Sequence, residues 1–213
     1  GSLFFLGYFF FQVPGIVYAR RRNTSRLIFF TLIVWGVLAA LTGIIRSFWL
    51  LAVDRLLLGV AESLIFPAML LLLTHWFTRT ERSRANAILI LGNPVTILWM
   101  SAITGFLIRS FGWQMTFILE GAPSIVWAFV WLVIVRDRPE GASWMSAEAS
   151  AHLGRQLATE QAALPKIGSL SKALLRPDVL LLSAQYFCWS LGVYGFVLWL
   201  PTIIRQGSSL GIG

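Results

Sequence analysis

The stretch Leu51–Phe77, LAVDRLLLGVAESLIFPAMLLLLTHWF, is apolar enough to cross a membrane, yet it carries Asp54, Arg55 and Glu62 in its first half. Because Arg55 and Glu62 are seven positions apart, a helix places them on one face, about 10 Å apart along its axis, with Gly59 between them. A helix that enters lipid just before this stretch would hold Arg55 about 8 Å deep and Glu62 about 20 Å deep, near the middle of the hydrocarbon core.

An ionisable side chain at such a depth is costly to bury and usually serves a function. The structural alternative is that Arg55 is neutralised by its neighbour Asp54, or that its head group reaches the membrane surface. Glu62 lies too deep for that and has no basic neighbour within one helical turn. The pair therefore favours a functional site inside the membrane.

Composition indicates an integral membrane protein. Of 213 residues, 57% are hydrophobic and 12% charged, and the mean hydropathy is +0.77, which soluble domains do not reach. The net charge of +8 comes from basic residues in short segments between apolar runs, so we expect no nucleic-acid partner. Thirteen of the Lys and Arg residues fall in segments 20–26, 78–84 and 136–176, and the positive-inside rule makes these segments cytoplasmic.

Six apolar runs are long enough to span a membrane in an all-α protein. Their expected bounds are 3–19, 27–45, 50–77, 84–108, 113–135 and 179–204. We expect a helical bundle over 1–139, a cytoplasmic linker with a surface helix at 147–164 over 140–176, and the first span of a second bundle over 177–213. Since the chain starts directly in an apolar run without Met, we expect it to be part of a longer protein.

Several positions in these runs are open to two interpretations. Tyr8, Gln12 and Gly15 share a helical face that either lines a polar cavity or meets a neighbouring helix and the membrane interface. Asn93 precedes Pro94 near the middle of its span, where it either contacts a ligand or satisfies the backbone that the proline disrupts.

Other positions suggest structural roles. Pro67 is expected to kink the central helix. The small residues at 36, 39, 40 and 43 predict close packing against another helix. We expect residues 119–123, LEGAP, to interrupt the fifth span and Glu120, only about 10 Å deep, to be structural.

Enzyme motifs are absent from the sequence. It contains no phosphate-binding P-loop, no His-Glu-x-x-His and no Gly-x-Ser-x-Gly, and both His75 and His152 lie at or beyond the cytoplasmic boundary. A single cysteine, Cys188, excludes an internal disulfide and a cysteine metal cluster. We therefore expect no enzyme, cofactor or metal site. Active transport would have to use an ion gradient, for which Glu62 is the natural proton carrier.

A set of motifs along nearly the whole chain resembles the major facilitator superfamily, and within it the anion:cation symporter branch. The motifs are Arg55-x-x-x-Gly59-x-x-Glu62, Pro67, Leu73-Thr74-x-Trp76-Phe77, Glu81-Arg82-x-Arg84, residues 7–15 (GYFFFQVPG), Trp35-Gly36, Gly112-Trp113, Glu120-Gly121-x-Pro123 and Asp137-Arg138-Pro139. Such proteins have twelve spans in two bundles, so the resemblance implies that this chain corresponds to spans two to seven.

The resemblance also implies roles for single residues. Arg55 and Tyr8 are expected to contact an organic anion, Glu62 to take part in proton coupling, and Asn93 to occupy a polar substrate position. We assign structural or gating roles to a further four residues, Gly15, Gly59, Pro67 and Glu120. The chain departs from the family after its first span, where Ala19 and Arg22 replace the usual Asp and Gly of a gating contact.

These observations predict a proton-coupled symporter of a small carboxylate, such as a sugar acid, in the inner membrane of a cell, monomeric as a full-length protein. Its two bundles would rock around a site at the membrane midplane. The alternatives are a facilitator or anion exchanger of the same fold, in which Glu62 tunes affinity, and a membrane protein that binds an anion without transporting it.

Overall fold

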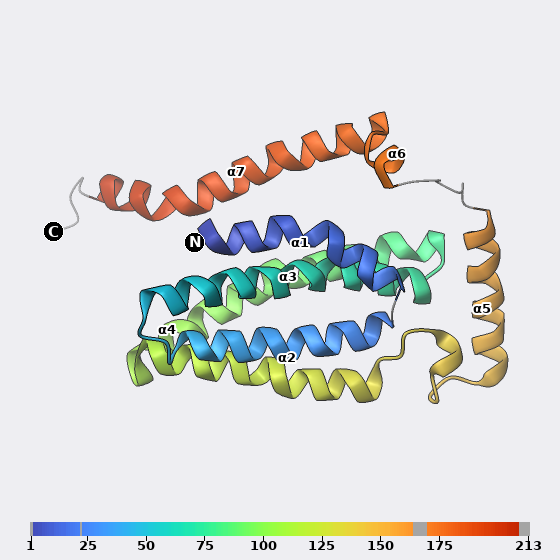
Figure 1. The fold of residues 1–213 in the computed structure, drawn as a ribbon, viewed down its shortest axis with the longest axis horizontal. Helices are drawn as coiled ribbons and strands as arrows, with labels where there is room; N and C mark the ends of the chain where they lie inside the picture. The colour runs from blue at the N-terminus through green and yellow to red at the C-terminus, as the bar shows by residue number, and fades with distance from the viewer. Residues whose placement is uncertain (1, 22, 164–169, 209–213) are drawn as a thin grey trace. The chain divides into compact units, whose positions relative to one another are not determined.

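The computed structural model of the chain describes residues 2–21, 23–163 and 170–208. The chain divides into two compact units, residues 1–163 and 164–213, which are described separately. In the first unit, long helices that follow one another in the chain run antiparallel (Figure 1). An all-helical membrane protein is what the composition predicts.

Three single helices open the first unit: α1 (Ser2–Arg21), α2 (Thr24–Thr42) and α3 (Phe48–Trp76). Each is long and apolar enough to cross a membrane. Asn23 caps the start of α2, because its side chain accepts a hydrogen bond from the Arg26 backbone N–H at 2.8 Å. The α3 helix continues through Pro67, which is buried.

The fourth helix, α4 (Arg79–Ile134), contains two of the predicted spans. Its backbone leaves helical geometry at Gly112, with φ 78° and ψ 165°, a conformation that glycine adopts without steric cost. The chain reverses there, and the second arm of α4 runs back beside α2 (Figure 1). Together with the three single helices, these arms supply the first five of the six predicted spans.

One expectation about α4 is wrong. Residues 119–123 do not interrupt the fifth span, because the backbone stays helical through Glu120 and Pro123. A proline removes only one backbone donor, and packing against a neighbouring helix can offset that loss. The break lies instead at Gly112, where the sequence predicts the turn between spans four and five.

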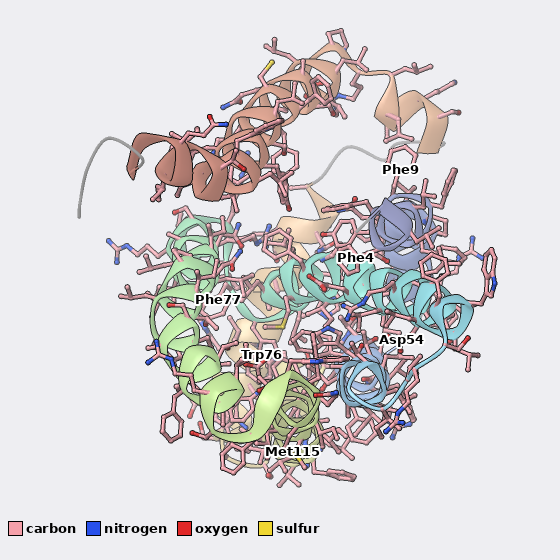
Figure 2. All side chains as sticks on the ribbon, turned by 90° about the vertical axis from the view of Figure 1, so that its left-hand side faces the viewer. Phe4, Phe9, Asp54, Trp76, Phe77 and Met115 are labelled. Carbon is pink, nitrogen blue, oxygen red and sulfur yellow. The ribbon has the colours of Figure 1, made fainter. Side chains whose placement is uncertain are left out.

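Glycines set the spacing between the helices. A Cβ added at Gly59 of α3 would overlap the backbone carbonyl oxygen of Phe4 in α1. Between α2 and α4, a Cβ at Gly36 would lie 2.9 Å from the Gly121 carbonyl oxygen, and one at Gly121 would lie 2.6 Å from that of Gly36. The predicted packing role of the small residues on α2 is confirmed. Figure 2 shows Phe4 on the side of α1 that faces α3 and Phe9 on the side that faces away.

A hydrophobic core joins α2, α3 and the second arm of α4. Its buried members are Ile28, Leu32, Ala68, Leu72, Ala128 and Trp131. The Trp131 indole N–H donates to the Ser25 carbonyl oxygen at 3.1 Å, so the largest of these side chains is also fixed by a hydrogen bond. This core holds the three helices together near the end of the unit where α2 begins.

At the same end, Asp137 caps α2. Its Oδ1 accepts hydrogen bonds from the backbone N–H groups of Thr24 at 2.7 Å and Ser25 at 3.2 Å. The His75 ring nitrogen Nδ1 lies 3.2 Å from the Asp137 carbonyl oxygen and 3.8 Å from Oδ1. A carboxylate at a helix N-terminus satisfies orphan donors and complements the helix dipole.

A short 3₁₀ helix η1 (Pro139–Gly141) and the surface helix α5 (Ala147–Ala162) follow. Ser146 caps α5: its hydroxyl oxygen accepts a hydrogen bond from the Ala149 backbone N–H at 3.3 Å. The predicted end of this helix, Leu164, lies outside the described residues. Glu160 of α5 accepts a 2.9 Å hydrogen bond from the backbone N–H of Arg79, which links α5 to the start of α4.

The second unit contains α6 (Leu170–Leu174) and α7 (Pro177–Ser208). Residues 177–200 of α7 form another candidate membrane span, matching the last predicted one. Arg176 and Asp178 form an exposed ion pair at 2.8 Å where α7 begins. The unit boundary after residue 163 falls inside the predicted linker, and the proposed division into domains stays a prediction.

Candidate functional site

A cavity of about 610 Å³ lies within the first unit, between α1, α2, α3 and both arms of α4. Most of its wall is apolar, and its charged lining residues come from two helices. The lining consists of Phe4, Phe5, Trp35, Gly36, Ala39, Arg55, Leu58, Glu62, Met100, Phe117, Glu120, Gly121 and Ser124.

The α3 side of the wall is the face that the sequence singles out. Arg55, Leu58 and Glu62 follow one another at i, i+3 and i+7, so one helical stripe turns all three toward the cavity. Arg55 and Glu62 are both half-buried. The structure thus brings a guanidinium and a carboxylate to one apolar chamber, as their spacing predicts.

The Arg55 side chain packs on an aromatic ring. Its Cζ lies 5.5 Å from the centre of the Phe117 ring, a cation–π contact that orients the guanidinium plane. Among the described residues, Arg55 forms no ion pair with a carboxylate. Its hydrogen-bonding fork is therefore available to a ligand.

The neighbouring Asp54 does not neutralise Arg55. Asp54 is only 4% exposed, and its Oδ2 accepts a 2.8 Å hydrogen bond from the Thr42 hydroxyl at the end of α2. Figure 2 shows Asp54 between α3 and α2. The structural alternative for this pair, mutual neutralisation, is not what the structure shows, because Asp54 instead ties α3 to α2.

A second stripe of lining residues comes from α4, and the sequence alone does not predict that it belongs to the site. Phe117, Glu120, Gly121 and Ser124 line the cavity at i, i+3, i+4 and i+7, a pattern that identifies one helical face. The Glu120 Oε1 accepts a hydrogen bond from the hydroxyl of Thr104 on the other arm of α4. The Ser124 hydroxyl donates to the Leu32 carbonyl oxygen at 3.0 Å.

The cavity therefore holds one guanidinium and two carboxylates with few partners of their own. Polar groups left unpaired in a low-dielectric region are costly, so such a set favours a bound polar ligand. A guanidinium binds a carboxylate through two parallel hydrogen bonds, whereas ionised carboxylates only accept them. The chemistry that fits is an anion with additional donor groups.

Two predicted substrate contacts lie away from this cavity. Tyr8 is half-buried on α1, with its ring centroid 6.2 Å from that of Phe4, but it does not line the cavity. Asn93 is exposed on the first arm of α4. The assignment of these two residues to substrate binding stays a prediction.

Three of the residues with predicted structural or gating roles, Gly15, Gly59 and Pro67, are buried inside the first unit. Gly59 adjoins the Phe4 backbone, and a Cβ at the buried Gly15 would overlap the Leu64 side chain. Pro67 is buried within α3. Ala19, where the family resemblance leads one to expect Asp, is 1% exposed, and Arg22 lies outside the described residues. Gating roles for these residues stay predictions.

Comparisons with known proteins identify the architecture. A family model described as Major Facilitator Superfamily matches residues 1–213. A solved structure titled as a bacterial homologue of the human lysosomal transporter Spinster, in an inward-facing and unoccupied conformation, is similar with a TM-score of 0.57. At 22% identity, covering 69% of this chain and 36% of that one, it shows the fold alone.

Two relatives align along the entire chain. A putative tartrate transporter of Agrobacterium vitis is 33% identical, covering 100% of this chain and 51% of the relative. A quinolone resistance transporter of Acinetobacter baumannii is 32% identical, with the same two coverages of 100% and 51%. The chain thus spans about half the length of the curated relatives it matches.

Proposed function

Because the chain belongs to the Major Facilitator Superfamily, we propose that the whole protein is a secondary active transporter that carries a small organic anion together with protons. The chain is a multi-pass membrane segment of that protein. In transporters of this kind, two helical bundles move against each other around a site near the membrane midplane. The cavity of the first unit would form one side of that site.

The observation that carries the proposal is the presence of Arg55 and Glu62 in one cavity. Arg55 would hold the carboxylate of the substrate bidentately, which the ammonium of a lysine cannot do. The Phe117 ring behind the guanidinium would keep its plane fixed while the substrate binds. The anion would thus lie against α3 and the second arm of α4.

Glu62 would couple substrate binding to a proton. A substrate carboxylate held by Arg55 would lie about 10 Å from an ionised Glu62. At an effective dielectric constant of 20, these two negative charges would repel each other by about 2 kcal/mol. Protonation of Glu62 removes this repulsion, so it would strengthen anion binding by more than about tenfold. A bound proton would then accompany each bound anion through the transport cycle.

A sugar acid or related carboxylate is the proposed cargo. The relative named a putative tartrate transporter is named for an acid with two carboxylates and two hydroxyl groups, and its hydroxyl groups are the feature that supports a hydroxy acid as cargo here. The relative named a quinolone resistance transporter raises a second candidate, transport of a quinolone. Competition for one site would separate them: an excess of a quinolone should leave uptake of the hydroxy acid unchanged if the acid alone is cargo.

The charge distribution supports a cytoplasmic position for the end of the unit where α2 and α4 begin, in a bacterial inner membrane. Exposed arginines gather there, against Arg46 and Arg109 at the other end. They are Arg20, Arg21, Arg26, Arg79, Arg84, Arg136, Arg138 and Arg155. Membrane proteins retain such segments on the cytoplasmic side.

Reconstitution of the full-length protein into vesicles tests the proposed function. An imposed proton gradient should drive accumulation of a labelled hydroxy acid, and Arg55→Lys should abolish most substrate binding although it keeps the charge. An exposed arginine of the same helix bundle, changed in Arg109→Lys, is the matched control and should transport normally. Uptake that only equilibrates the acid would indicate a facilitator, and binding without uptake would indicate an anion-binding protein.

A further inference from the structure

We propose that Glu120, held in place by Thr104, binds the hydroxyl groups of the transported acid, and that the substrate class is a hydroxylated monocarboxylate. This inference rests on the proposed function, since it takes the substrate carboxylate to lie on Arg55. It adds a residue to the site, and it narrows the class of acid.

The charges that line the cavity limit the charge of the ligand. Arg55 can neutralise one carboxylate, whereas Glu62 and Glu120 both carry acceptor oxygens. A second carboxylate on the ligand would meet groups of its own sign, and like charges in a low-dielectric site repel strongly. Hydroxyl groups, by contrast, donate to carboxylates in strong hydrogen bonds.

The geometry around Glu120 leaves it open to the cavity. Thr104 lies on the first arm of α4 and does not line the cavity, so its hydroxyl reaches Glu120 from the side away from the ligand. That bond engages Oε1, while Oε2 accepts no hydrogen bond from the described residues. The carboxylate is thus oriented by one oxygen and presents the other to a donor.

The two remaining polar groups do not offer this chemistry. The Ser124 hydroxyl is committed to the Leu32 carbonyl oxygen, and Arg55 supplies only donors. If Glu62 takes up the coupled proton, it loses part of its capacity to accept. Glu120 is therefore the acceptor that the cavity keeps for substrate hydroxyls throughout the cycle.

Binding of two acids with the same carbon skeleton tests the proposal. Gluconate and hexanoate each have six carbons and one carboxylate, but only gluconate carries hydroxyls. Calorimetry on the purified full-length protein should show that Glu120→Gln weakens gluconate binding about 10- to 100-fold, the range for a hydrogen bond to a charged group. Hexanoate binding should change less than about twofold, because it does not use this bond.

Two further variants separate positioning from binding. Thr104→Val removes the bond that orients Glu120, so gluconate binding should weaken by less than in Glu120→Gln while hexanoate binding is unchanged. Ser101→Ala removes a hydroxyl from the same arm of α4 that bonds only to the Leu98 carbonyl oxygen, and it should affect neither acid.

Several outcomes would overturn the inference. One is an equal loss of affinity for gluconate and hexanoate in Glu120→Gln. Another is wild-type protein that binds hexanoate as tightly as gluconate. A third is wild-type protein that binds the dicarboxylate glucarate more tightly than gluconate. Failure of the proposed function gives a different result, namely carboxylate binding that is unchanged in Arg55→Lys. The two hypotheses can therefore fail separately.

Discussion

Gly59→Ala tests whether direct backbone contact holds α1 against α3. The added Cβ would overlap the Phe4 carbonyl oxygen, and a backbone atom cannot move aside as a flexible side chain can. Overpacking of this kind costs about 1–3 kcal/mol. Alanine also stabilises a helix by about 1 kcal/mol relative to glycine. The change in the free energy of unfolding of Gly59→Ala alone would therefore underestimate the cost of the clash.

Gly92→Ala is the matched control, because a Cβ at Gly92 meets no atom within 4 Å and gains the same helix propensity. The propensity gain cancels between the two variants, and the difference in their free energies of unfolding should be about 1–3 kcal/mol. Unfolding of the full-length protein in mixed detergent micelles, followed by tryptophan fluorescence, measures that difference. Equal free energies of unfolding would refute the proposed backbone contact.

Three further outcomes are expected. Phe117→Leu should weaken carboxylate binding about 2- to 30-fold, because it removes the ring that the Arg55 guanidinium packs on. The control Phe111→Leu, at an exposed position, should leave carboxylate binding unchanged. Unchanged binding in Phe117→Leu would contradict a role for the cation–π contact. Asp137→Ala should lower the free energy of unfolding by about 1–3 kcal/mol because two backbone donors lose their acceptor, while the exposed Asp178→Ala should change it little. In a Cys188→Ser background, a cysteine replacing Arg109 should react with an impermeant reagent added outside the cell and one replacing Arg26 should not; the reverse pattern would invert the topology.

The fold was predictable because its strongest signals are local. Apolar runs of sufficient length define the spans, and the turn at Gly112 follows from a glycine between two such runs. The breaker residues around Pro123 were misleading, because a helix backbone tolerates one missing donor when packing supports it. A glycine such as Gly121 can either interrupt its own helix or allow a second helix to pack closely. Which of the two occurs depends here on Gly36, a partner more than eighty positions away in the sequence.

The site was predictable only on α3. The spacing of Arg55 and Glu62 within one apolar helix shows that they share a face, but no local pattern shows which other helices complete the cavity. Its small expected depth predicts a structural role for Glu120. That Glu120 lines the cavity together with Phe117 and Ser124 follows only from the packing of α4 against α2 and α3. The Thr104 bond to Glu120 depends on the reversal of the chain between them.

Glu62→Gln tests the central claim, that this carboxylate carries the coupled proton, most directly. Glutamine has nearly the same shape and mimics the protonated acid, so the full-length variant in vesicles should bind substrate and exchange labelled for unlabelled acid at close to the wild-type rate. Uphill uptake driven by a proton gradient alone should be lost. A variant that still concentrates the acid with the proton gradient as its sole energy source would contradict the assignment of Glu62 as the proton carrier.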